Sequence, residues 1–196
     1  MKKGTLIAII ILAVSGMITA WAVSRYNAFV TMQENVEGAW GQVENQYQRR
    51  ADLVPNLVAT VKGYSAHEQA TFVQVIEARS KATQITIDPS NITPEQLAQF
   101  QAAQGELSQA LGRLMAVAES YPDLKANENF KQLADQLEGT ENRIAYARNQ
   151  FNDCAKEYNA ATRRFPRNII ASMFGFERKP YFEAEAGAEK APKVEF

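Results

Sequence analysis

The sequence predicts an all-α protein with an N-terminal transmembrane helix, a long antiparallel up-and-down four-helix bundle and a C-terminal aromatic arm. Residues 4–24 contain no charged side chain, and the chain beyond them repeats apolar residues at alternating spacings of three and four. Sustained alternation of apolar and polar residues is lacking, so strands are not expected. The predicted segments are an anchor at 1–25, a four-helix bundle at 26–165, an aromatic arm at 166–183 and a flexible tail at 184–196.

The uncharged stretch 4–24 is long enough to cross a membrane. Its 21 residues span about 30 Å as a helix, which is the thickness of the hydrocarbon core. Trp21 and Tyr26 stand at its far end, where amphipathic rings favour the headgroup region. Two lysines precede the stretch and only Arg25 follows it closely, which predicts a cytoplasmic N-terminus and a bundle on the other side. The side chains expected in lipid include Leu6, Ile9, Ile10, Leu12, Val14 and Ile18.

The same stretch also fits a cleaved signal peptide. Ala20-Trp21-Ala22 satisfies the small-x-small rule for cleavage, and a basic start before an apolar stretch is common to both kinds of segment. The apolar run is long, however, and the helical pattern continues past the cleavage point without a break. The sequence therefore favours an uncleaved anchor.

Four apolar stripes follow the anchor, each with the heptad spacing of a helix that packs along another helix, as in a coiled coil. Polar side chains interrupt the stripes at Gln33, Gln104 and Thr140. Such positions fix helix register or bind water more often than they catalyse a reaction. Burying the four stripes together gives an up-and-down bundle. The stripes cover residues 29–47, 54–75, 97–121 and 130–165.

The junction between the first two stripes is placed at residues 50–55. Asp52 is a candidate cap for a new helix, and Pro55 is tolerated in a first turn. The alternative is a kink in one very long helix, with packing partners supplied by an oligomer. A reversal is favoured because three side chains before the junction would otherwise lack partners within the chain, namely Trp40, Val43 and Tyr47.

Caps and prolines mark the other boundaries. Residues 63–68 resemble a helix stop followed by a capping box, which predicts a kink. Thr93, Pro94 and Gln96 have the pattern of a cap, a first-turn proline and a glutamine at the third helical position. Asn127 is a candidate cap for the fourth helix. Two prolines are expected to follow helix ends, Pro122 and Pro166.

The composition excludes most enzyme classes. His67 is the only histidine and Cys154 the only cysteine, which excludes His-pair metal motifs, Cys-rich clusters and an internal disulfide. We expect no catalytic, cofactor-binding or metal-binding residue, and no cofactor. Cys154 is expected to be a small buried side chain on the fourth stripe. The net charge of −1 argues against a nucleic-acid partner.

The chain contains several motifs, namely Val36-Glu37-Gly38-Ala39-Trp40, Gln48-Arg49-Arg50-Ala51-Asp52-Leu53-Val54-Pro55-Asn56, Glu77-Ala78-Arg79, Phe174-Gly175-Phe176 and Tyr181-Phe182-Glu183. These motifs resemble those of the LemA family, and the resemblance runs from the anchor to about Glu183. It implies a bacterial protein of the inner membrane, with a single span, a helical bundle outside it and no established catalytic activity. Genes of this family often lie near those of membrane proteases and envelope proteins.

Two groups of residues are candidates for contact with partners. The first is a dense polar cluster that would bind acidic groups; the simpler interpretation is a helix cap beside arginines whose stems cover the bundle edge. Its residues are Arg49, Arg50, Asp52 and Asn56. The second lies on the arm and would meet lipid, a neighbouring subunit or the open end of its own bundle. Its residues are Phe165, Ile169, Met173, Phe174, Phe176, Tyr181 and Phe182.

These features together predict a non-enzymatic scaffold of the bacterial cell envelope that self-associates or recruits partners. Membrane lipid is the expected partner of the anchor, and a homo-oligomer or an envelope protein is the expected partner of the bundle. One alternative is an adaptor or regulator of a membrane protease. The least favoured alternative is an enzyme with a carboxylate site, because a single histidine cannot complete the familiar di-iron pattern.

Overall fold

The computed structural model describes residues 3–65 and 67–183, and every regular element in these residues is a helix. The expected all-helical class is therefore confirmed for this part of the chain, while the tail expected at 184–196 lies outside it. The elements are α1 (Lys3–Lys62), α2 (Gln69–Gln84), the short 3-10 helix η1 (Pro89–Asn91), α3 (Pro94–Glu119), α4 (Pro122–Ala126), α5 (Glu128–Arg163) and α6 (Arg167–Phe174).

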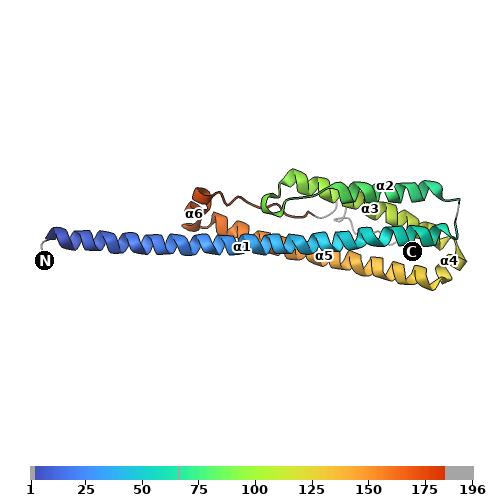
Figure 1. Ribbon diagram of the computed structural model, residues 1–196, viewed down its shortest axis with the longest axis horizontal. Helices are drawn as coiled ribbons and strands as arrows, with labels where there is room; N and C mark the ends of the chain where they lie inside the picture. Colours follow the sequence, from blue (N-terminus) through green and yellow to red (C-terminus); the bar gives the residue numbers. More distant parts are fainter. Residues whose placement is uncertain (1–2, 66, 184–196) are drawn as a thin grey trace, which may run out of the picture.

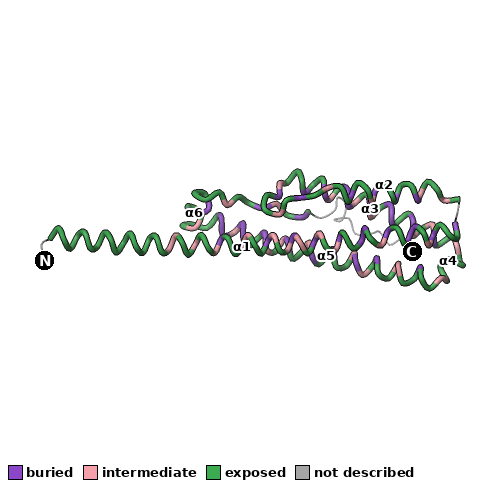
Figure 2. The backbone as a smooth tube through the Cα atoms, in the orientation of Figure 1, coloured by how far each residue is buried: buried purple, intermediate pink, exposed green. Residues whose placement is uncertain are grey.

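Helix α1 is 60 residues long, which corresponds to about 90 Å. Its N-terminal part projects from the remaining helices on its own (Figure 1), and residues 3–20 are exposed throughout (Figure 2). An 18-residue window of this helix has a mean hydropathy of 2.5 and no buried residue. In the described residues, α1 is thus the one helix long and apolar enough to cross a membrane.

The predicted reversal at residues 50–55 is wrong, because α1 continues to Lys62. The apolar stripe of the first helix also continues, with buried residues at alternating spacings of three and four. An arginine occupies one position of that stripe and hides its continuity in the sequence. Asp52 is exposed and accepts a 2.8 Å hydrogen bond from Gln48 rather than capping a helix. The continuing stripe consists of Tyr47, Arg50, Val54, Leu57 and Val61.

Pro55 lies inside α1, where a proline removes one backbone hydrogen bond. The carbonyl that loses its donor belongs to Ala51, four residues earlier. Arg79 of α2 supplies a replacement, because its Nε donates to the Ala51 carbonyl at 2.7 Å. An unpaired carbonyl at a buried position would cost about 1–3 kcal/mol. The contact between α1 and α2 therefore supports the long helix at its proline.

The chain reverses after α1, between Gly63 and Glu68, where only a kink was expected. The expected capping box is not formed, since Glu68 precedes α2 without a side-chain cap. Ser65 instead donates its hydroxyl to the Val61 carbonyl at 3.0 Å, within the end of α1. From this turn α2 runs back along the body, α3 runs outward again and α5 returns (Figure 1). Helix α5 packs along α1, and α2 packs along α3.

The starts of α3 and α5 agree with the predicted caps. Thr93 Oγ1 accepts from the Gln96 amide at 3.2 Å, and Gln96 Oε1 accepts from the Thr93 amide at 3.1 Å. Asn127 Oδ1 accepts from the Phe130 amide at 3.0 Å. Both helices also end before the expected prolines. These local signals are confirmed because they depend only on residues three or four positions apart.

The apolar interior forms two clusters along the length of the body. The proximal core lies nearer the projecting part of α1 and contains most of the buried rings, including Phe29, Trp40, Tyr47, Phe100, Phe151, Tyr158 and Phe182. The distal core lies nearer α4 and is mainly aliphatic, including Val54, Leu57, Val61, Leu107, Leu111, Leu114 and Leu137. The candidate functional residues lie between these clusters and at the end of the body from which the apolar part of α1 projects.

Candidate functional site

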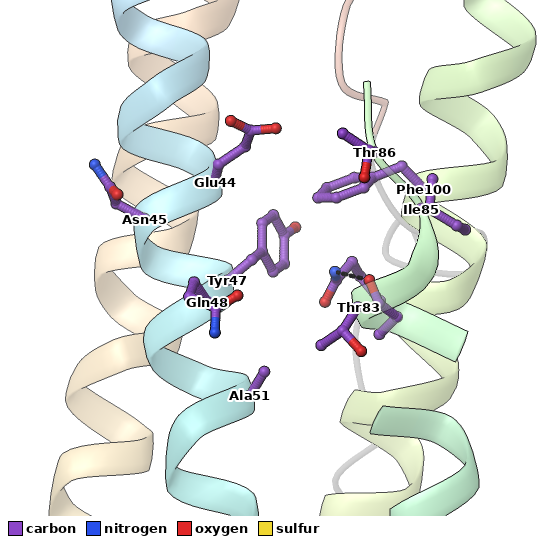
Figure 3. Close-up of a pocket in the computed structure, with 11 residues that line it drawn as sticks. Glu44, Asn45, Tyr47, Gln48, Ala51, Thr83, Ile85, Thr86 and Phe100 are labelled. Carbon is purple, nitrogen blue, oxygen red and sulfur yellow. Dashed lines mark hydrogen bonds between the residues drawn. The ribbon is translucent and has the colours of Figure 1, made fainter. Parts of the chain in front are cut away.

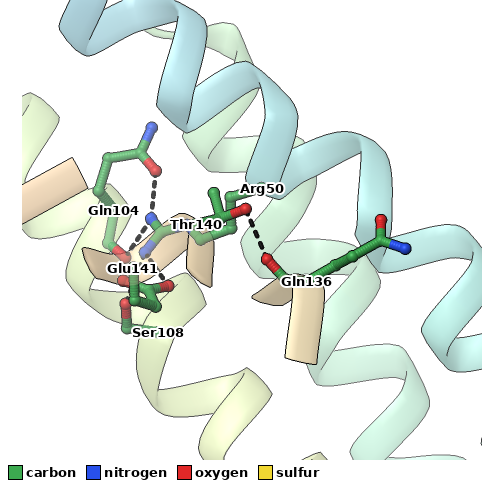
Figure 4. Close-up of polar contacts among 6 residues, drawn as sticks. All are labelled: Arg50, Gln104, Ser108, Gln136, Thr140 and Glu141. Carbon is green, nitrogen blue, oxygen red and sulfur yellow. Dashed lines mark hydrogen bonds and ion pairs between the residues drawn. The ribbon is translucent and has the colours of Figure 1, made fainter. Parts of the chain in front are cut away.

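A layer of polar side chains separates the proximal core from the distal core. Three polar residues lie between the two clusters, one on each of three helices: Arg50 on α1, Gln104 on α3 and Thr140 on α5. On each helix, the polar residue separates the side chains in the proximal core from those in the distal core. The exposed fractions of Arg50, Gln104 and Thr140 are 2%, 6% and 0%. The sequence singled out Gln104 and Thr140 as interruptions of apolar stripes, and the structure brings both close to Arg50 (Figure 4). We call these three residues the polar layer.

Arg50 is the centre of this layer. Its Nη1 donates to Ser108 Oγ at 2.7 Å and to Glu141 Oε1 at 3.0 Å. Its Nη2 donates to the carbonyl oxygen and to the side-chain oxygen of Gln104, at 3.1 and 2.5 Å (Figure 4). The guanidinium carbon also lies 5.0 Å from the centre of the Tyr47 ring. A guanidinium stays charged when buried, so these partners offset the cost of removing it from water.

The layer ties four helices together. Arg50 joins α1 to α3 and α5, and the side chain of Gln104 donates to the Ala82 carbonyl of α2 at 3.3 Å. Glu141 is 43% exposed, so the ion pair reaches water at one side of the body. This arrangement suits a role in setting helix register, because both Nη groups of Arg50 have partners at fixed positions of neighbouring helices.

A cavity of about 250 Å³ lies beside the layer, between α1 and the end of α2. Figure 3 shows Glu44, Tyr47 and Gln48 on α1 facing Thr83 and Thr86 across it. Glu44 is the only ionisable carboxylate in this lining, and the lining holds no histidine or cysteine. Within the described residues, no group of three His, Cys, Asp or Glu side chains is placed to hold a metal ion.

Residues 175–183 form an extended C-terminal segment that two asparagines of α5 hold by its backbone. Asn159 accepts from the Lys179 amide at 2.9 Å and donates to its carbonyl at 2.8 Å. Asn152 does the same at Phe182, at 2.8 and 3.0 Å. Seven helical residues span about 10.5 Å and three extended residues about 10 Å, so the two spacings match. The segment therefore runs antiparallel to α5.

This segment completes the proximal core. The Phe182 ring stacks on Trp40 with centroids 5.9 Å apart and meets Phe151 at 5.4 Å. The Arg148 guanidinium covers the same ring at 5.0 Å. Lys179 is buried and donates to the Ser90 carbonyl, and this burial lowers the pKa of its amine. The partners that Trp40 was expected to lack come from α3, α5 and this segment.

The structure separates the predicted polar cluster. Arg49, Asp52 and Asn56 are exposed, whereas Arg50 is buried and does not share their surface. The docking role predicted for the three exposed residues stays a prediction. Cys154 is half-buried on its stripe, and burial raises the pKa of its thiol, with Glu157 and Asp153 adding to the effect. The thiol form is therefore favoured over the reactive thiolate.

The predicted residues of the arm have different environments. Phe182 is buried and Phe176 is half-buried. The others remain exposed although they are apolar, and they comprise Phe165, Ile169, Met173, Phe174 and Tyr181. The roles of Asn152 and Asn159 were not predicted from the sequence. Their heptad spacing on α5 was the available signal, but a side-chain amide does not reveal which backbone it binds.

The described residues thus define a helical protein whose longest helix has the length and composition of a membrane span. Residues 39–196 match the LemA family, and the chain belongs to that family. It is 32% identical to the magnetosome protein MamQ of Magnetospirillum gryphiswaldense over 200 aligned positions, which cover 93% of this chain and 73% of the relative.

Two further relatives support the assignment. The magnetosome protein MamQ 2 of Paramagnetospirillum magneticum is 29% identical, over 95% of this chain and 76% of its own length. The protein LemA of Metamycoplasma hominis is 24% identical, over 83% of this chain and 70% of its own length. The family membership that the motifs indicated is confirmed.

Proposed function

We propose that this protein is a non-enzymatic, single-pass scaffold of the bacterial cell envelope. In this proposal the N-terminus is cytoplasmic, the apolar part of α1 crosses the inner membrane, and an up-and-down bundle of four long helices stands outside it. The bundle self-associates or recruits an envelope partner through its helical surfaces. The observation that carries the proposal is the passage of α1, without a break, from the apolar stretch into both cores.

The length of α1 gives this arrangement a definite geometry. About 22 residues, from Lys3 to Ser24, match the thickness of a membrane core. The remaining 38 residues, from Arg25 to Lys62, extend about 57 Å beyond it. Because α2, α3 and α5 pack on this second part, the whole body takes its position from one helix. One continuous helix that crosses the membrane and carries the body suits a protein that presents a surface at a fixed height above the membrane.

The groove between α3 and α5 is the surface that we assign to self-association. It has a volume of about 500 Å³, and its floor includes Leu111, Met115 and Leu137. Acidic side chains at its edge, Glu138 and Glu141 among them, leave the floor apolar. An apolar floor with a polar rim is typical of protein interfaces. A helix of a second copy is the occupant that fits such a groove between two helices.

The mass of the full-length protein tests self-association. Light scattering in mild detergent, corrected for bound detergent, should give a discrete multimer. A Cβ added at Gly112 meets no atom within 4 Å, so Gly112→Arg would fill the groove without disturbing α3. Gly38→Arg on α1 is the matched control, since that position is equally open. We expect a reduced mass for the first variant only. A monomeric wild-type protein would contradict self-association.

A further inference from the structure

Helix α6 is amphipathic, and among the described residues its outer face stays open to solvent apart from the contact of Phe174 with Tyr26. Ile170 and Ala171 point inward and are 5% and 4% exposed. On the other side the apolar side chains are open to solvent, a costly arrangement if water were their final environment. Their exposed fractions are 48% for Ile169, 70% for Met173 and 55% for Phe174, and Phe165, two residues before the helix, is 81% exposed.

The position of α6 along α1 indicates what covers this face. The ring of Tyr26, two residues past the apolar stretch, lies 4.9 Å from the ring of Phe174 and 5.6 Å from that of Phe176. Trp21 and Ala22, within the stretch, pack against the proximal core. Figure 1 shows α6 at the end of the body from which the apolar part of α1 projects.

The depth of α6 relative to the membrane follows from the rise per residue of α1. From Ser24 to Phe29 α1 advances about 7.5 Å, and Phe29 packs on Phe176 at 5.0 Å. The headgroup region on each side of a bilayer is about 5–8 Å thick. Helix α6 therefore falls at headgroup level when the apolar stretch fills the hydrocarbon core.

The charge around α6 has the sign that anionic headgroups attract. Between Tyr158 and Phe176 the sequence holds Arg163, Arg164 and Arg167 and no acidic residue. Arg163 and Arg164 are exposed, and among the described residues none of the three arginines forms an ion pair. Basic side chains beside exposed apolar residues are typical of helices that lie in a membrane interface.

We propose that α6 lies in the headgroup region of the membrane that α1 crosses, with Phe165, Ile169, Met173 and Phe174 in contact with lipid and the arginines near the phosphates. The body is then held at two points, the span and α6, and it cannot swing freely about residue 25. This inference rests on the proposed anchor. The exposed face of α6 lies beside the apolar stretch of α1, so the lipid around that stretch is the molecule available to cover it.

The test uses single fluorescent labels on the full-length chain in nanodiscs that hold one copy each. Cys154→Ala removes the native thiol, and Met173→Cys carries the label on the exposed face of α6. Ile18→Cys, at a site 61% exposed on the apolar part of α1, reports on the anchor. Ile76→Cys on α2, at a site 55% exposed, is the matched apolar control outside α6. Brominated lipids quench a label that touches their acyl chains.

We expect strong quenching at position 18, clear quenching by shallow bromines at position 173, and none at position 76. Quenching at 18 without quenching at 173 overturns the docking of α6 and leaves the anchor in place. A label at 18 that is not quenched overturns the anchor itself. If the label at position 173 enters an apolar environment only in discs that hold two copies, a second copy rather than lipid covers this face of α6. That result also overturns the proposal.

The arginines are tested separately in discs with anionic lipid. Arg164→Gln with Arg167→Gln should lower the ratio of docked to undocked α6 about fivefold for each charge removed. Arg113→Gln on α3 is the control for loss of an exposed arginine elsewhere. Equal quenching at position 173 in the double variant, the Arg113→Gln control and the protein with all its arginines overturns the role assigned to the arginines. An unchanged far-UV circular dichroism spectrum shows that each protein remains folded.

Discussion

The proximal and distal cores differ in their residue composition. The distal core is largely aliphatic and is enclosed by helices alone. The proximal core contains most of the buried aromatic rings, and it needs the loops at Ile87 and Ile92 and the C-terminal segment at Phe182 to close it. Helix-on-helix packing of a heptad stripe thus suffices at the far end of the body. At the end from which the apolar part of α1 projects, large rings and parts of the chain distant in sequence pack together around α1.

The largest effect is expected from Trp40→Ala in the proximal core. Trp40 is fully buried and meets the rings of Phe100, Phe151 and Phe182 at 5.3–5.9 Å. Its removal should lower the free energy of unfolding by about 3–5 kcal/mol, as measured by denaturation in detergent. Hydrogen exchange should then increase in residues 175–183 more than in α2. Leu114→Ala, its distal counterpart, should show the opposite pattern; the same exchange pattern in both variants would mean one undivided core.

The polar layer offers the next test, because it separates the two cores. Arg50→Ala should cost about 2–4 kcal/mol of unfolding free energy, since it leaves a cavity and an unpaired Gln104. Arg50→Met with Gln104→Leu keeps the volume and removes both polar groups, so its stability should lie within about 1 kcal/mol of the wild type. A double variant as unstable as the alanine variant would show that the polar contacts themselves, rather than packing, hold the layer together.

A smaller effect is expected from pH at Tyr158 of the proximal core. Burial, with a contribution from Glu177, raises the pKa of this hydroxyl from 10.0 to about 12. The folded state therefore favours the neutral form, and that stabilisation is full below pH 10 and is lost as pH rises to about 12. Relative to Tyr158→Phe, the wild type should lose about 2–3 kcal/mol between pH 9 and 12 in parallel denaturation curves. An unchanged difference would mean that the hydroxyl titrates as it does in water.

The smallest effect concerns the distal half, at the proline of α1. Arg79→Met leaves the Ala51 carbonyl without its 2.7 Å donor and should cost about 1–3 kcal/mol. In a Pro55→Ala background, the amide gained at position 55 supplies that carbonyl within the helix, so the same change should cost less. A double-mutant cycle measures this coupling. Equal costs in the two backgrounds would show that Arg79 acts through other contacts.

Local signals explain how much of the fold the sequence predicts. Thr93 and Asn127 mark helix starts through neighbours within one turn, and the stripes of α3 and α5 depend only on spacing. The end of α1 was misplaced because Arg50 stands at an apolar position and Pro55 suggests a new helix. Both residues are made compatible with a continuous helix by partners far along the chain, Glu141 and Arg79. Spacing within one stretch of sequence carries no information about such partners.

The candidate sites were less predictable than the helices. Gln104 and Thr140 were recognisable as polar positions in apolar stripes, yet their relation to Arg50 required the arrangement of three helices. Asn152 and Asn159 bind a segment without regular structure, which periodicity does not detect. The apolar face of α6 could be predicted from composition, but its place beside Tyr26 came from the return of α5 toward the start of the body.

In the proposed membrane arrangement, the unbroken course of α1 would make the protein act as a lever. Transmembrane helices tilt by about 20° on average, and a straight helix that extends about 57 Å beyond the lipid carries its far end sideways by about 20 Å at that angle. A change of bilayer thickness that alters the tilt is therefore amplified at α4, the part of the body most distant from the membrane. Arg79 replaces the hydrogen bond that Pro55 removes, and so helps to keep α1 straight in the part of the helix beyond residue 51. If α1 crosses the membrane as proposed, the orientation of its apolar part therefore sets the orientation of the body that packs on it.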